Sequence, residues 1–190
     1  MRDRIEWELK DLKEGSIVLA LTNATNYNDA NIDFIKYLVY TKNEPGVYLT
    51  FNKPYATMKQ ILEDENIDPR MIIFIDAITL PSGGKTDDSD RCLYLNDLRN
   101  LSDLAVIIDE AVDVIPYEKK FLFLDSLSTL LLYNNTGSAA KFVHFLTGKL
   151  RALKLDAIFL SLELESDTEF LAQLSLFCDK NINLSESQTT

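Results

Sequence analysis

The sequence predicts one three-layer αβα sandwich built on a mostly parallel sheet. Short apolar runs alternate along the chain with amphipathic stretches of helical spacing, in a regular β-α-β-α order. The apolar runs are continuous, which is typical of parallel strands covered on both faces. With 190 residues, 46% of them hydrophobic, the chain is long enough for one domain with a full core.

The first half of the chain contains three expected strands and two expected helices. Each strand is an apolar run bounded by a glycine, a proline or an acid, and each helix has apolar residues three or four positions apart. Strands are predicted at residues 16–21, 47–51 and 71–75, and helices at 31–40 and 55–64. A loop rich in Gly, Ser and Asp follows at 81–90. In the amphipathic start of the chain, Trp7 is expected to pack on the core or on a partner subunit.

The second half continues the alternation. A helix is expected at 101–115, with Ser102 as its N-cap, and the apolar run at 121–124 ends at Asp125. The remaining elements are a helix at 138–153, a strand at 157–162, a helix at 168–177 and a short strand at 181–184. We therefore expect a single domain at residues 1–184 and a polar tail at 185–190 that frays.

Composition excludes several classes of function. The formal net charge of −11 disfavours non-specific binding to nucleic acid. The apolar runs are far shorter than the ~20 residues of a membrane-spanning helix, and no signal peptide is apparent after Met1. Cys92 and Cys178 lie far apart, without metal-ligand spacing. These features predict a soluble cytoplasmic protein that binds neither nucleic acid nor membranes.

The segment after the first strand is the first place to look for a ligand, because parallel α/β sheets bind ligands at the carboxyl ends of their strands. Residues 22–29 contain no glycine to wrap a phosphate and no lysine to neutralise one. Asp29 adds negative charge where a helix N-terminus would otherwise attract phosphate. A polar strand-to-helix connection is therefore expected. If a nucleotide binds there, the candidate ligands are Asn23, Thr25, Asn26 and Asn28.

A second phosphate-like motif lies in the loop after the third strand. Ser-Gly-Gly-Lys-Thr at 82–86 carries the Gly-Lys-Thr end of a Walker A motif. The first glycine is missing, since Thr79 stands five residues before Gly84, and no helix pattern opens at Thr86. We expect a flexible contact loop, in which Lys85 and Thr86 become phosphate ligands only if a nucleotide binds.

Two acidic sequences resemble a Walker B motif. Phe-Leu-Phe-Leu-Asp at 121–125 matches the pattern in which the Asp holds Mg²⁺ through water, so Asp125 is the candidate metal residue. An Asp that ends a buried strand is also common without any metal. In Val-Ile-Ile-Asp-Glu at 106–110, the apolar residues have helical spacing, so Asp109 and Glu110 are expected on a solvated helix face.

Other candidates for catalysis are weak. His144 is the single histidine and is expected to be exposed on its helix. Glu163 and Glu165 follow the fifth expected strand. They are either catalytic residues of a different enzyme chemistry on the same sheet or solvent-exposed residues at the end of a strand.

The chain from residue 121 onward carries a family resemblance. Asp-Ser-Leu-Ser-Thr-Leu-Leu at 125–131 follows an apolar strand, and Lys-Phe-Val-His-Phe-Leu at 141–146 and Leu-Arg-Ala-Leu at 150–153 come next. This series resembles the Walker B strand and its sequel in KaiC-like proteins of the RecA-like P-loop ATPases. The likeness in element order extends over nearly the whole chain. It implies a RecA-like sheet, an archaeal source, and rings or pairing with related ATPases and signalling proteins.

The departures from that family bear on activity. KaiC-like ATPases carry a P-loop after the first strand and acidic residues after the second, where this chain has Asn52-Lys53-Pro54. Both the phosphate cradle and the general base are therefore missing. We expect a pseudo-ATPase without a cofactor, which acts through a protein partner or a homo-oligomer as a regulatory or signalling module. The alternative is an ATP- and Mg²⁺-binding protein that uses Lys53 or Lys85 together with Asp125.

Overall fold

The computed structural model describes residues 1–164 and 167–185. Within these ranges, seven parallel strands form one sheet in the order β4-β3-β2-β5-β6-β1-β7. The strands are β1 (Ile17–Thr22), β2 (Gly46–Thr50), β3 (Ile72–Asp76), β4 (Cys92–Tyr94), β5 (Phe121–Asp125), β6 (Asp156–Leu162) and β7 (Lys180–Asn183). The α/β sandwich predicted from the sequence is confirmed, and every strand pair in the sheet is parallel.

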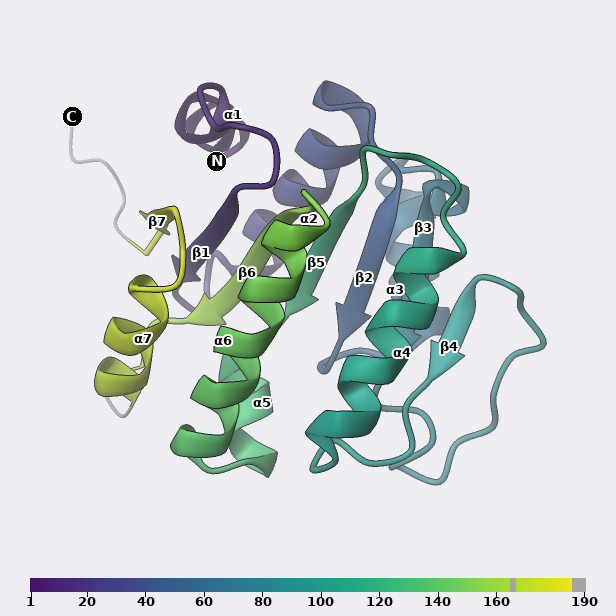
Figure 1. Ribbon diagram of the computed structural model, residues 1–190. Coiled ribbons are helices and arrows are strands. Elements are labelled where there is room, and N and C mark those ends of the chain that lie inside the picture. Colours follow the sequence, from purple (N-terminus) through teal and green to yellow (C-terminus); the bar gives the residue numbers. More distant parts are fainter. Residues whose placement is uncertain (165–166, 186–190) are drawn as a thin grey trace.

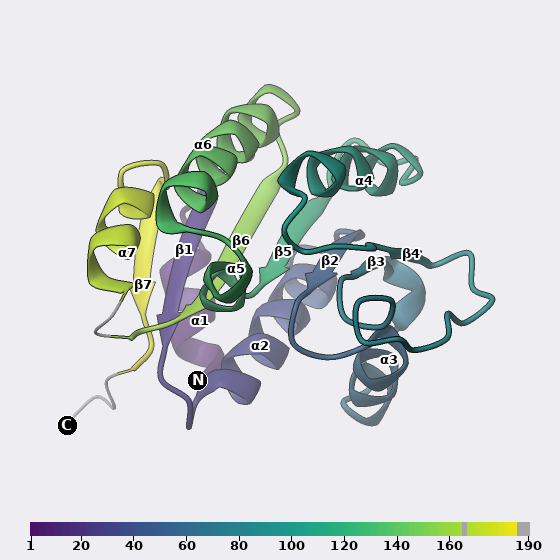
Figure 2. The ribbon, with the colours of Figure 1, turned by 90° about the horizontal axis from the view of Figure 1, so that it is seen from below.

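Helices cover both faces of the sheet, which gives three layers (Figures 1 and 2). One face carries α1 (Arg2–Leu9), α2 (Tyr27–Lys36) with the π-helical turn η1 (Tyr37–Thr41), and α3 (Tyr55–Asp64). The other face carries α4 (Leu101–Asp113), α5 (Leu127–Tyr133), α6 (Thr136–Ala152) and α7 (Thr168–Ser175). A 3₁₀ turn, η2 (Pro69–Met71), leads into β3.

The core consists of two apolar clusters, one on each face of the sheet. Successive residues of a strand point to opposite faces, so each central strand contributes to both clusters. In β5, Phe121 and Phe123 pack under α1–α3, whereas Leu122 and Leu124 pack under α4–α7. All four side chains are fully buried. This double burial explains why the strands are continuous apolar runs in the sequence.

Gly46 at the start of β2 is fixed by close packing. A methyl group at this position would overlap the ring of Phe121 on the neighbouring strand. Glycine at this position therefore leaves room for the Phe121 ring beside the β2 backbone.

Several local expectations were wrong. The first helix after β1 begins at Tyr27 and not at residue 31. Asn100, and not Ser102, caps α4, because its side chain accepts a hydrogen bond from the Asp103 N–H. Of the two places expected for Trp7, the core of its own chain is wrong: Trp7 is 64% exposed, beside Lys10, and packing on a partner subunit stays a prediction. Among the described residues, no helix has the length and apolar character needed to cross a bilayer.

Candidate functional site

The carboxyl end of β5 lies at the middle of the sheet edge seen in Figure 2. There Asp125 pairs in register with Thr50 of β2 on one side and with Leu160 of β6 on the other. β1 lies next to β6, so the loop after β1 approaches the same edge. Asp125 is completely buried, and its carboxylate is the centre of the site.

Three side chains donate hydrogen bonds to Asp125. The Tyr48 hydroxyl donates to Oδ2 at 2.6 Å, and the Asn52 amide donates to Oδ1 at 2.9 Å. The Tyr27 hydroxyl, from the first residue of α2, also donates to Oδ1. Both carboxylate oxygens are therefore bound by groups of the same chain, and the fully buried side chain exposes no oxygen to a Mg²⁺-bound water.

A second layer of polar groups holds these donors in place. The Asn31 amide donates to the Tyr48 hydroxyl at 2.8 Å, and the Thr129 hydroxyl donates to the Asn52 side-chain carbonyl. Ser126, directly after Asp125, caps α5 through the Thr129 N–H. The network thus joins α2, β2, β5 and α5, and every member has partners inside the protein.

The electrostatics favour a neutral acid at the centre. Burial raises the pKa of Asp125 to about 8, although its three hydrogen-bond donors favour the ionised carboxylate. Burial also raises the pKa of Tyr48 well above its usual value. Burial thus shifts Asp125 towards its protonated form, and a protonated acid is a poor ligand for Mg²⁺.

The residues after β1 use their polar groups to hold the C-terminal segment. The Asn23 amide donates to the Ser185 carbonyl at 2.8 Å, and the Asn26 amide donates to the Leu184 carbonyl at 3.0 Å. Asn23 also accepts a hydrogen bond from the Asn26 N–H at 2.9 Å. Thr25 is exposed, and Asn28 accepts a hydrogen bond from the Lys53 ammonium at 2.9 Å.

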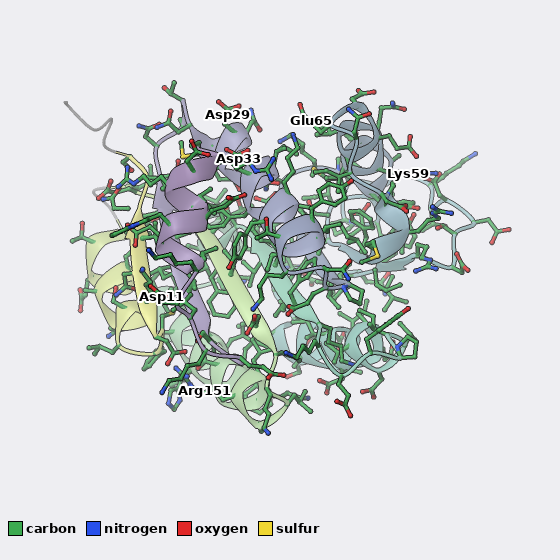
Figure 3. The ribbon with its side chains drawn as sticks, turned by 90° about the horizontal axis from the view of Figure 1, so that it is seen from above. Asp11, Asp29, Asp33, Lys59, Glu65 and Arg151 are labelled. Atoms are coloured by element: carbon green, nitrogen blue, oxygen red, sulfur yellow. The ribbon has the colours of Figure 1, made fainter. Side chains whose placement is uncertain are left out.

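A cavity of about 460 Å³ lies between α2 and α3, and Lys53 reaches into it. Its charged lining includes three carboxylates, two lysines and the amino group of Met1, whose charge acts on Asp33. The lining contains Asp29, Asp33, Lys36, Lys53 and Glu65. Figure 3 shows the two aspartates on α2 and the glutamate near the end of α3. Burial lowers the pKa of Lys53 and raises the pKa of Asp33. A triphosphate would therefore meet as many carboxylates as cations here, and one of the cations, Lys36, is already paired with Glu65.

Lys85 and Thr86 lie far from the loop after β1. They are exposed in the segment between β3 and β4, at the opposite side of the sheet. β2, β5 and β6 separate β3 from β1, and Figure 1 shows the segment extending outward beside β4. The structure therefore does not bring these two residues together with Asn23, Thr25 and Asn26.

Asp76 is a buried acid whose contacts the sequence did not reveal. It ends β3 and accepts hydrogen bonds from the N–H groups of Tyr55, Ile78 and Thr79 at 2.7–2.8 Å, and from the Thr79 hydroxyl at 2.6 Å. These bonds fix the start of α3 and the turn after β3. The four donors are a sufficient structural reason for a carboxylate at this position.

The remaining candidates lie outside this centre. Asp109 and Glu110 are on α4, as the helical spacing predicted, and His144 is exposed on α6 with its ring 4.8 Å from that of Phe177. Glu163 is exposed and accepts a hydrogen bond from the Asn183 amide. Glu165 lies outside the described residues.

ATP and Mg²⁺, which the ATPase resemblance implies, do not fit the residues present at this edge. Residues 22–29 provide neither glycine nor lysine, and the Asp125 oxygens are engaged by internal donors. In the part of the chain that the structure describes, no three His, Cys, Asp or Glu residues are grouped so that they could hold a metal ion.

Comparisons with known proteins agree on the architecture alone. No protein-family model matches the sequence, and no curated protein matches it. Among solved structures, the chain is similar to a KaiC-like protein from the hyperthermophilic archaeon Pyrococcus horikoshii OT3, with a TM-score of 0.65 and 14% sequence identity. The match covers 94% of this chain and 76% of the other. This chain therefore has the RecA/KaiC-like α/β fold.

Proposed function

We propose that this protein is a non-hydrolysing KaiC/RecA-like pseudo-ATPase that works as a protein-interaction module in regulation or signalling. The observation that carries the proposal is the closed environment of Asp125. Its carboxylate is buried beneath Tyr27 and Tyr48, and its pKa is raised to about 8 by burial. An ATPase of this fold needs an ionised, accessible acid at this point.

The loop after β1 supports the same proposal. In a P-loop, backbone N–H groups and a lysine surround phosphate. Here Asn23 and Asn26 hold the carbonyls of Leu184 and Ser185, so the loop anchors the end of β7. The free thiols of Cys92 and Cys178 fit a reducing compartment such as the cytoplasm, where we place the protein.

Nucleotide binding at an atypical loop is the second candidate, and Lys53 is the observation that favours it. Its ammonium lies near the carboxyl edge and contacts Asn28, in the first turn of α2. Among the described residues it forms no ion pair with a carboxylate, so it is a cation available to a phosphate. The three carboxylates that line the adjacent cavity oppose this function.

A thermal-shift titration with ATP and Mg²⁺ separates the two functions. A ligand present at 100 times its Kd stabilises a protein by about 2.7 kcal/mol. For a chain of this length, that raises Tm by about 5–10 °C. The pseudo-ATPase proposal predicts no rise, and no release of phosphate. Nucleotide binding predicts a rise that Lys53→Met abolishes and that Lys59→Met, a matched change of an exposed lysine on α3, leaves intact.

A further inference from the structure

The outer surface of the α4–α7 layer carries an excess of exposed apolar side chains. Val106 on α4 is 57% exposed, and Phe145 on α6 is 55% exposed. The others on these helices and at their ends are Val114, Leu132, Tyr133, Leu153 and Leu176. The α1–α3 layer exposes Met1, Trp7 and Tyr40. Clusters of apolar side chains on a surface mark sites of interaction with other molecules.

Helices α4 and α6 run side by side and in the same direction on this surface (Figures 1 and 2). An ion pair between Asp109 of α4 and Lys149 of α6 links them and sets their relative level. Val106 lies about one turn before Asp109, and Phe145 lies about one turn before Lys149. Val106 and Phe145 therefore lie at about the same height along the two helix axes.

The two helices carry opposite charge. α4 contains four acids and no lysine or arginine, and α6 contains two lysines and an arginine and no acid. The exposed acids of α4 are Asp103, Glu110 and Asp113. The exposed bases of α6 are Lys141 and Arg151, of which Arg151 is paired with Asp179 of the same chain at 2.8 Å. The surface of each helix is thus complementary in charge to that of the other.

We propose that this α4/α6 surface binds a second copy of the chain, with α4 of each copy lying on α6 of the other. The two copies are related by a two-fold axis that is parallel to α4 and α6 and lies midway between them. This rotation places α4 of each copy over α6 of the other, and it leaves the height of every residue along the helix direction unchanged. Val106 of one copy then meets Phe145 of the other. At the end of the contact that holds the first turns of the helices, Asp103 of one copy faces Lys141 of the other across the interface.

The size of the surface predicts a weak dimer. Helices about 10 Å wide and, for α4, about 20 Å long give a footprint of roughly 400 Å² per copy. Stable complexes bury about 800 Å² per partner, so association is expected to depend on concentration. This dimer does not involve Asp125 or the loop after β1, so its test is independent of the nucleotide titration.

Sedimentation velocity over a concentration series tests the proposal on the full chain. The expected result is a shift from the 21.6 kDa monomer to a species of twice that mass as concentration rises. Because the two-fold axis repeats the Asp103–Lys141 contact, Lys141→Glu and Asp103→Lys each place like charges at two contacts and should raise the dimer Kd about tenfold or more. The double variant restores opposite charges and should bring Kd back to the wild-type range.

Two further variants make the result specific to this surface. Phe145→Ser removes an exposed side chain at the centre of the interface and should abolish the dimer while the circular dichroism spectrum stays unchanged. Lys59→Glu reverses an exposed charge on α3, on the opposite layer, and should leave Kd unchanged. A monomer at every concentration overturns the proposal. A dimer also overturns it if its Kd is unchanged by Lys141→Glu and Asp103→Lys, or if the double variant does not restore the wild-type Kd.

Discussion

Replacing Asp125 by Asn tests whether the acid at the centre of the sheet is neutral in the folded protein. An asparagine keeps the shape and one acceptor oxygen but cannot ionise. Its amide can donate to the Tyr48 hydroxyl, which in turn lies 3.2 Å from the Asn31 side-chain oxygen. Asp125→Asn should therefore fold, and the informative quantity is how its free energy of unfolding changes with pH.

The expected size follows from the pKa of Asp125, which burial raises from 3.8 to about 8. A raised pKa means that the folded state binds the proton more tightly than the unfolded state does. The stabilisation from this group is therefore complete below pH 4 and is lost as pH rises towards 8. The slope is about 1.4 kcal/mol per pH unit, which gives a loss of about 3–4 kcal/mol between pH 5 and pH 8.

Urea unfolding of wild type and Asp125→Asn at intervals from pH 5 to pH 9 provides the measurement. The difference in unfolding free energy between the two proteins should shift in favour of the variant by about 3–4 kcal/mol between pH 5 and pH 8, and then level off. Asp11→Asn, a change at an exposed acid labelled in Figure 3, serves as the matched control. Parallel profiles for wild type and Asp125→Asn would refute the reasoning, because Asp125 would then be ionised in the folded protein over this pH range.

Two substitutions elsewhere test the packing and the buried hydrogen bonds. Gly46→Ala should destabilise the protein by about 3 kcal/mol or more, because its methyl overlaps the ring of Phe121, and a Tm within two degrees of wild type would contradict this. Asp76→Ala should cost about 3 kcal/mol or more in urea unfolding, because it removes the acceptor for four buried or half-buried donors. An unchanged unfolding midpoint would show that water replaces the carboxylate at no cost.

Much of the architecture could be predicted from the sequence, because burial on both faces produces continuous apolar runs. The predicted β1, β2, β3 and β5 match the structure within one residue at each end. β4 was missed, since Cys92–Tyr94 is only three residues long and lies at the edge of the sheet. Such a short strand has no period from which it could be recognised.

The centre of the candidate site could be only partly predicted. The sequence predicted Asp125 as a site residue, because it ends an apolar run. The sequence did not predict which side chains donate hydrogen bonds to Asp125. Tyr48 lies inside a run typical of a strand, and nothing in its sequence context shows that its hydroxyl faces a carboxylate on β5. The contact of Tyr27 with Asp125 could be predicted only if it were known that the first helix after β1 begins at Tyr27. Long-range register, which a single sequence does not encode locally, decides both contacts.

The position of β1 in the sheet has a consequence for how the chain is built on the ribosome. β1 pairs with β6 on one side and β7 on the other, at residues 156–162 and 180–183, whereas β1 itself ends at Thr22. An apolar strand synthesised early therefore has no neighbour until the last third of the domain emerges. Closure of this long loop costs entropy that only the assembled sheet repays, so β1 is expected to join the sheet only after residues 156–183 have been synthesised. Until then, the edges of β1 are open to chaperones and to aggregation.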